Sequence, residues 1–103
     1  MFDKKKNTAE SYGVIGLGRF GTALVKTLTD AGKEVIAVDK DEAKVKAVRG
    51  WTDYAFVIDE LTETSLKETG MQNCSTVTIC IGEKVDVSIL TTMLVTKLGV
   101  PHV

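Results

Sequence analysis

The stretch VIGLGRFGTALV, residues 14–25, places three glycines at the spacing G-x-G-x-x-G. The spacing alone is weak evidence, but here an apolar run precedes it and a helical pattern follows it. In such a strand–turn–helix unit Gly16 allows a tight turn, Gly18 lets a pyrophosphate approach the backbone, and Gly21 lets the helix pack closely on the strand. The helix N-terminus then offers free N–H groups to phosphate oxygens. The motif therefore predicts a nucleotide-binding loop.

The rest of the chain alternates short apolar runs with helical patterns. The runs are continuously apolar, which is typical of parallel strands covered on both faces, and right-handed crossovers place helices on both faces. We predict an α/β fold with a doubly wound, parallel, Rossmann-like sheet of order 3-2-1-4-5. Strands are expected at 12–16, 34–38, 54–58 and 76–81, helices at 19–31, 42–49, 62–69 and 84–98, and the start of a fifth strand at 100–103.

The first predicted helix carries its apolar residues at helical spacing, which gives it an inward face. Gly32 follows this helix as its C-terminal cap. The apolar residues at this spacing are Phe20, Ala23, Leu24, Leu28 and Ala31.

Composition is that of one globular domain: 103 residues, of which 44% are hydrophobic and 26% charged. The net charge of −1 does not indicate nucleic-acid binding. Only Lys4–Lys6 is locally basic, and we expect residues 1–11 to form a flexible tail. Neither a signal peptide nor an apolar run of about 20 residues is evident, which favours the cytoplasm. The domain at 12–103 ends abruptly, so we expect it to be truncated at its C-terminus.

Two cysteines, Cys74 and Cys80, would lie about 20 Å apart on one extended strand. A disulfide needs Cα atoms within about 7 Å, so we expect both thiols to be reduced. A redox role for Cys80 is the alternative.

An acidic residue completes the dinucleotide fingerprint when it ends the second strand. Asp39 follows EVIAV (34–38) and lies 18 residues after Gly21. Its carboxylate would accept hydrogen bonds from ribose hydroxyls and repel a 2′-phosphate, which favours NAD over NADP. The alternative is a turn or cap residue, because the sequence DKDE begins the next helix.

Arg19 opens the first helix, where the macrodipole disfavours a cation. A guanidinium here would reach phosphate oxygens, and the alternative is a solvated arginine. Asp59 ends the third strand. It could accept a hydrogen bond from an adenine amino group, or it could be a loop residue before the next helix. Gly82 permits close approach at the end of the fourth strand. Glu83 would repel phosphates there unless a cation intervenes, which makes it a candidate metal ligand.

These residues resemble a known family. GLGRFG (16–21), the strand ending in Asp39, and ICIG (79–82) followed by SILTTMLVTKLGVPHV (88–103) are similar to the N-terminal lobe of regulator-of-potassium-conductance domains. These are the TrkA-N or KTN domains of Trk/Ktr-type potassium uptake systems, and the Ktr-type cytosolic subunit is the most similar. The resemblance covers residues 12–103.

The resemblance implies a cytoplasmic regulatory subunit, peripheral to the inner face of the membrane, and no catalysis. Members bind NAD(H) or ATP/ADP, with Mg²⁺ accompanying ATP, and the nucleotide gates a membrane potassium transporter by conformational change. They assemble as homodimers and then as octameric rings in the full-length protein. The arginine of GRFG contacts terminal phosphates of ATP in Ktr-type members, a role that falls on Arg19.

Two departures bear on the site. Many members have Gly-Asp-Ala where this chain has Ile58-Asp59-Glu60, and Glu83 replaces a residue that is usually small or neutral. Two other functions compete: the cofactor half of an NAD-dependent dehydrogenase, and a module that has lost its ligand. The predicted cofactor-binding residues are Gly16, Gly18, Arg19, Phe20, Gly21, Asp39, Lys40, Asp59, Ile81 and Gly82, with Glu83 as the candidate metal ligand.

Overall fold

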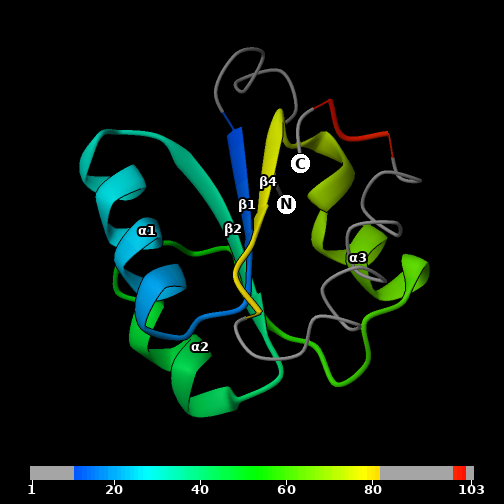
Figure 1. Ribbon diagram of the computed structural model, residues 1–103, viewed down its shortest axis with the longest axis horizontal. Helices are drawn as coiled ribbons and strands as arrows, with labels where there is room; N and C mark the ends of the chain where they lie inside the picture. Colours follow the sequence, from blue (N-terminus) through cyan, green and yellow to red (C-terminus); the bar gives the residue numbers. More distant parts are fainter. Residues whose placement is uncertain (1–10, 82–98, 102–103) are drawn as a thin grey trace.

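A four-stranded parallel sheet forms the centre of the computed structural model, which describes residues 11–81 and 99–101 (Figure 1). Its strand order is β3-β2-β1-β4, which confirms the predicted order for these four strands. The strands are β1 (Ser11–Ile15), β2 (Glu34–Asp39), β3 (Ala55–Val57) and β4 (Thr76–Ile79). The helices are α1 (Arg19–Asp30), α2 (Glu42–Val48) and α3 (Glu63–Thr69), followed by the short 3-10 helix η2 (Met71–Asn73).

Helices cover both faces of the sheet, as the continuously apolar strands predict. Figure 1 shows α1 and α2 on one side of the strands and α3 on the other. Alternate strand residues point to the two faces, so neighbouring positions belong to different cores. On one face Val14 and Val35 pack with Val25 of α1 and Val45 of α2, whereas on the other Ile36 packs with residues of α3 and η2.

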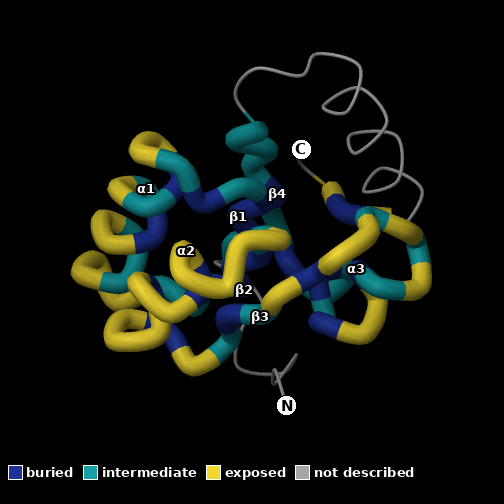
Figure 2. Tube along the Cα trace, turned by 90° about the horizontal axis from the view of Figure 1, so that it is seen from below, coloured by how far each residue is buried: buried dark blue, intermediate teal, exposed yellow. Residues whose placement is uncertain are grey.

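The second core gathers residues that are far apart in the sequence, and it lies between the sheet and α3. Leu66 of α3 and Met71 of η2 are fully buried in it, and Val100 is buried there too. Figure 2 shows that buried residues run through the middle of the domain, with exposed residues along the outer sides of the helices. Residues 99–101 form no strand, and the other residues of the predicted fourth helix and fifth strand lie outside the described residues.

Helix α1 ends in a Schellman motif that the sequence predicts through Gly32. Gly32 has φ +80°, its N–H donates to the carbonyl oxygen of Thr29 at 3.0 Å, and the N–H of Lys33 donates to that of Leu28 at 3.0 Å. This is the pattern expected when a glycine follows the C-cap. In the same way Gly70 ends α3 with φ +87°.

The apolar spacing of α1 coincides only in part with its buried side. Gly21 and Val25 are buried, and Leu24 and Leu28 pack partly against the core, but Phe20 is 70% exposed and Ala23 and Ala31 are exposed as well. The reason is the close contact of Gly21 with the sheet, which turns that side of the helix inward and leaves its neighbour Phe20 outside.

Several strand boundaries differ from the prediction by one or two residues. Ser11 is buried and begins β1, so the strand includes the last residue of the predicted tail. Residues just before β4 hold Ser11 in place. The hydroxyl of Ser75 donates to the carbonyl oxygen of Ser11 at 2.8 Å, and the hydroxyl of Ser11 donates to the carbonyl oxygen of Asn73 at 3.2 Å. β4 ends at Ile79 instead of Ile81.

Replacing Leu66 tests how much α3 depends on its core. Leu66→Ala removes a fully buried side chain and is expected to lower the free energy of unfolding by about 2–5 kcal/mol. Urea denaturation followed by circular dichroism measures the change. The control is Leu61→Ala, at a partly buried position beside the same core, which is expected to cost clearly less. An equal loss for both variants would contradict the assignment of Leu66 as the anchor.

Candidate functional site

The glycine loop leaves the sheet directly after β1. Gly16 has φ +100°, a left-handed conformation that favours glycine. A Cβ atom at this position would lie 2.7 Å from the carbonyl oxygen of Cys80 and 3.1 Å from the nitrogen of Ile81. The N–H of Gly16 donates to the carbonyl oxygen of Val38 at 2.9 Å, which ties the loop to the neighbouring strand β2. Glycine therefore suits residue 16 for two reasons: the turn needs a left-handed backbone, and the main chain after β4 leaves no room for a side chain.

Gly21 lies in the first turn of α1 and is buried against this turn. A Cβ atom there would overlap the carbonyl oxygen of Gly16 and would lie 3.4 Å from the Cβ atom of Cys80. No side chain fits in that space without moving the backbone. The helix can therefore start directly over the end of the strand only because residue 21 is glycine.

Gly18 is different, because open space surrounds the position of its missing side chain. No atom lies within 4 Å of a Cβ built there. Gly18 is the N-cap of α1, in extended conformation and without a side-chain cap. Within the part of the chain that the structure describes, the N–H groups of Arg19, Phe20 and Gly21 have no acceptor. These donors point out of the end of a 12-residue helix, where an anion is favoured.

The other two helices have capped N-termini. The side chain of Asp41 accepts from the N–H of Ala43 at 2.9 Å at the start of α2. Thr62 and Ser65 form a capping box at the start of α3, and both helices have a glutamate in the first turn. Helix α1 has neither a cap nor an acidic residue in its first turn. Its N-terminus is therefore the one among these three helices that leaves its donors and its positive end for a ligand.

Asp39 lies beside the glycine loop, at the carboxyl end of β2. Its Oδ2 accepts from the N–H of Leu17 at 2.7 Å, and its Oδ1 accepts from the N–H of Asp41 at 2.8 Å. The carboxylate thus holds the middle of the loop and also shapes the turn before α2. A carboxylate has about four lone-pair directions, so two directions are left for further donors. Both readings of Asp39, turn residue and hydroxyl acceptor, are compatible with this geometry.

Three of the predicted site residues are exposed around this loop. Arg19 is the first residue of α1 and Phe20 the second, and Lys40 lies in the turn between β2 and α2. Their exposure leaves their side chains available to a ligand at the carboxyl edge of the sheet, where ligands of open α/β folds bind.

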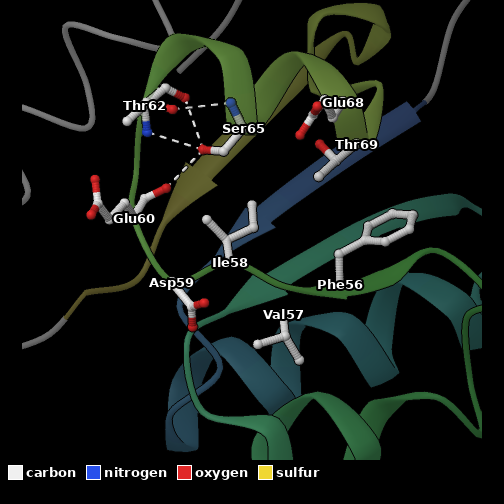
Figure 3. Close-up of a pocket in the computed structure, with 9 residues that line it drawn as sticks. All are labelled: Phe56, Val57, Ile58, Asp59, Glu60, Thr62, Ser65, Glu68 and Thr69. Carbon is white, nitrogen blue, oxygen red and sulfur yellow. Dashed lines mark hydrogen bonds between the residues drawn. The ribbon is translucent and has the colours of Figure 1, made fainter.

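Asp59 is exposed just past β3, and it is separated from the glycine loop by β2. It lines a pocket of about 440 Å³ between β3 and α3, which we call the β3–α3 pocket (Figure 3). None of the glycine-loop residues lines this pocket, so Asp59 is the only predicted site residue in it. Ile81 is half-buried behind Gly16, and Gly82 and Glu83 lie outside the described residues.

Two residues of the loop have roles that the glycine motif does not predict. Leu17 is 2% exposed, so its side chain anchors the loop in the core while its N–H binds Asp39. The hydroxyl of Thr22 donates to the carbonyl oxygen of Leu17 at 2.9 Å and braces the loop from the helix. The only sequence feature that could have predicted the anchoring role of Leu17 is its apolar side chain between the first two glycines of the motif.

The two cysteines are free, as expected, and they lie at opposite ends of β4. Burial raises the pKa of the Cys74 thiol to about 12 and also raises the pKa of the Cys80 thiol. Raised values keep both thiols protonated at neutral pH, and the thiolate is the reactive form. The geometry therefore gives no support to a redox role for Cys80.

Residues 11–81 and 99–101 contain no group of three or more His, Cys, Asp or Glu side chains arranged to hold a metal ion. The candidate ligand Glu83 falls outside these residues, so its role stays a prediction. In the same part of the chain, no helix is long and apolar enough to cross a membrane.

Sequence comparison supports the same picture as the loop geometry. The family model for the TrkA-N domain matches residues 12–103. The chain belongs to the TrkA-N domain family. This confirms the resemblance expected from GRFG and from the pattern at 88–103. TrkA-N domains are Rossmann-like and nucleotide-binding in general, which agrees with the uncapped helix and the open Gly18.

Curated relatives of this TrkA-N domain are proteins of potassium uptake systems. Ktr system potassium uptake protein C of Bacillus subtilis (strain 168) is 42% identical over 91 residues, covering 88% of this chain and 41% of that protein. Ktr system potassium uptake protein A of Vibrio alginolyticus is 39% identical over 98 residues, covering 95% of this chain and 44% of that protein. The chain therefore spans about two fifths of the length of these relatives.

Alanine substitutions separate the packing glycine from the open one. Gly21→Ala places a methyl group on the carbonyl oxygen of Gly16, and we expect it to lower the free energy of unfolding by about 1–3 kcal/mol or more. Gly18→Ala meets no atom and changes only the N-cap residue, so we expect a loss of about 1 kcal/mol or less. Thermal and urea unfolding of both variants measure the difference, and equal losses would contradict these separate roles.

Proposed function

We propose that this chain is the nucleotide-binding domain of a cytoplasmic regulatory subunit of a potassium uptake system. The observation that carries the proposal is the N-terminus of α1, which lacks a side-chain cap beside the open position of Gly18. The names of the relatives add potassium uptake as the process. The ligand is NAD(H) or ATP/ADP, with Mg²⁺ accompanying ATP and Glu83 as its candidate ligand.

Different residues of the loop would contact different parts of the nucleotide. The free N–H groups of the first turn of α1 would hold phosphate oxygens, and Gly18 leaves room for them to approach. Arg19 would add a charged contact to the outer phosphates. Asp39 would accept from ribose hydroxyls with the lone pairs that Leu17 and Asp41 leave free, and its negative charge disfavours a 2′-phosphate. Phe20, Lys40, Asp59, Ile81 and Gly82 complete the proposed set around the same edge of the sheet.

Regulation then follows from differential affinity and needs no chemical step. A nucleotide that binds two assembly states unequally shifts their populations, whereas equal binding would shift nothing. We propose that the full-length protein forms homodimers that assemble into an octameric ring, next to a membrane potassium transporter that the ring gates. The chain itself acts by binding and not as an enzyme.

Calorimetric titration of the chain with ATP, ADP, NAD and NADH, with and without Mg²⁺, tests the proposal. We expect at least one nucleotide to bind, and Gly18→Ala to weaken that binding while leaving the fold intact, because its methyl group occupies the space of the phosphates. Absence of binding by all four nucleotides would contradict the proposal. Tighter binding of ATP than ADP, improved by Mg²⁺, would assign the site to ATP, and a preference for NAD or NADH without a metal effect would assign it to a dinucleotide.

Arg19→Ala tests the contact with the outer phosphates. If Arg19 binds the terminal phosphates of ATP, the variant weakens ATP more than NAD, by about tenfold for the loss of one charge-assisted hydrogen bond. The matched control is Lys44→Ala, which removes one positive charge from the exposed side of α2. Calorimetry on both variants measures the two affinities, and equal weakening of ATP and NAD by Arg19→Ala would contradict this role.

A further inference from the structure

The β3–α3 pocket is separate from the glycine loop and has its own chemistry. Figure 3 shows Phe56 and Ile58 projecting from β3 toward α3, while Val57 points to the opposite face of the sheet. Ser65 and Thr69 line the pocket from α3. The hydroxyl of Ser65 donates to the carbonyl oxygen of Glu60 at 2.8 Å, and that of Thr69 donates to the carbonyl oxygen of Leu66 at 2.7 Å. Phe56 and Ile58 thus give the pocket an apolar floor, and the hydroxyl groups of Ser65 and Thr69 already donate to backbone carbonyl oxygens.

The rim of this pocket is acidic. Asp59, Glu60 and Glu68 line it and are exposed, and no lysine or arginine is among the lining residues. None of these three carboxylates forms an ion pair in the described part of the chain, whereas Glu63, outside the pocket, lies 3.8 Å from the ammonium nitrogen of Lys67. That lysine is the only basic residue in the range 55–81, which contains four acidic residues. The rim therefore favours a positively charged partner.

The pocket also borders an open strand edge, because β3 is the last strand on its side of the described sheet. The carbonyl oxygen of Tyr54 accepts from the N–H of Ala37 at 2.9 Å, and the N–H of Ile58 donates to the carbonyl oxygen of Asp39 at 3.0 Å. Backbone groups alternate along a strand, so those of Val57 point away from β2. Among residues 11–81 and 99–101 the N–H and carbonyl of Val57 have no hydrogen-bond partner.

Among the described residues, a side-chain hydrogen bond reaches only the start of this edge. The guanidinium of Arg49 donates to the carbonyl oxygen of Ala55 at 3.5 Å, which leaves the N–H and carbonyl of Val57 open beside the pocket. An unpaired edge of this kind accepts an extended chain as an additional strand.

We propose that the edge of β3 and the β3–α3 pocket together bind an extended protein segment that carries lysine or arginine. Its backbone pairs with the N–H and carbonyl of Val57. Its alternate side chains point to α3, lie with their aliphatic stems on Phe56 and Ile58, and bring their charges to Glu60 and Glu68. The remaining side chains contact the side chain of Val57, which is 39% exposed. The inference does not depend on nucleotide binding.

A labelled heptapeptide in which valine and lysine alternate serves as the probe. Fluorescence anisotropy measures its binding to the chain at low salt, next to a peptide in which glutamate replaces lysine. We expect binding of the lysine peptide alone. No binding of the lysine peptide, or equal binding of the glutamate peptide, would overturn the proposal.

Val57→Pro tests pairing at the strand edge. Proline removes the outward N–H of residue 57 and leaves the ladder between β2 and β3 intact, and proline is tolerated on edge strands. We expect about tenfold weaker binding of the lysine peptide, since one hydrogen bond is lost and the added strand is displaced. Val57→Thr is the control, because it keeps the N–H and the branched side chain, and its binding is expected to match that of the unmodified chain.

A paired substitution tests the acidic rim. Glu60→Gln combined with Glu68→Gln keeps the size of both side chains, and we expect roughly fivefold weaker binding. Asp30→Asn combined with Glu42→Gln removes the same charge from exposed positions elsewhere and is expected to have no effect. Equal effects of the two pairs would overturn the role of the pocket.

Two further outcomes are decisive. Unchanged peptide binding in Val57→Pro would overturn strand addition. Sedimentation that shows a dimer of the unmodified chain and a monomer of Val57→Pro, with no peptide binding, would assign the edge to a second copy and overturn the proposal. Nucleotide titration of Val57→Pro keeps the two sites apart, because this variant is expected to bind nucleotide as the unmodified chain does.

Discussion

The close contact between Gly21 and the carbonyl oxygen of Gly16 is the constraint on which the rest of the site depends. It brings the first turn of α1 directly over the end of β1, so that the free N–H groups of the helix face the carboxyl edge of the sheet. Asp39 then holds the loop from β2, and Leu17 holds it from the core. Contacts with β1, β2 and the residues after β4 therefore define the shape of one short loop.

The same contact explains what could and could not be predicted from the sequence. Continuously apolar runs, glycine caps and the G-x-G-x-x-G spacing are local signals, and they led to the correct order of the four described strands and the correct positions of α1, α2 and α3. The orientation of α1 depends on how closely Gly21 approaches a carbonyl group, which is a tertiary property. For this reason the apolar spacing does not show that Phe20 is exposed, whereas Leu24 and Leu28 do pack against the core.

The site shows a similar division between local and long-range information. Gly16, Gly21 and Asp39 were predictable because a fixed spacing brings them to the edge of a parallel sheet. The bond from Thr22 to Leu17 was not, since a hydroxyl in a first helical turn has several available acceptors and the sequence does not select one. The separation of the β3–α3 pocket from the glycine loop could not be predicted either. The sequence places Asp59 after a strand, but it does not show on which side of that strand a cavity forms.

The packing of Gly16 against the backbone that follows β4 has a mechanical consequence. The atoms nearest to the missing side chain of Gly16 are main-chain atoms of Cys80 and Ile81. A displacement of the loop by even a fraction of an ångström would therefore press on the backbone itself, at the point where the chain continues into its C-terminal part. At Gly16 this link runs through backbone atoms, which every residue type has.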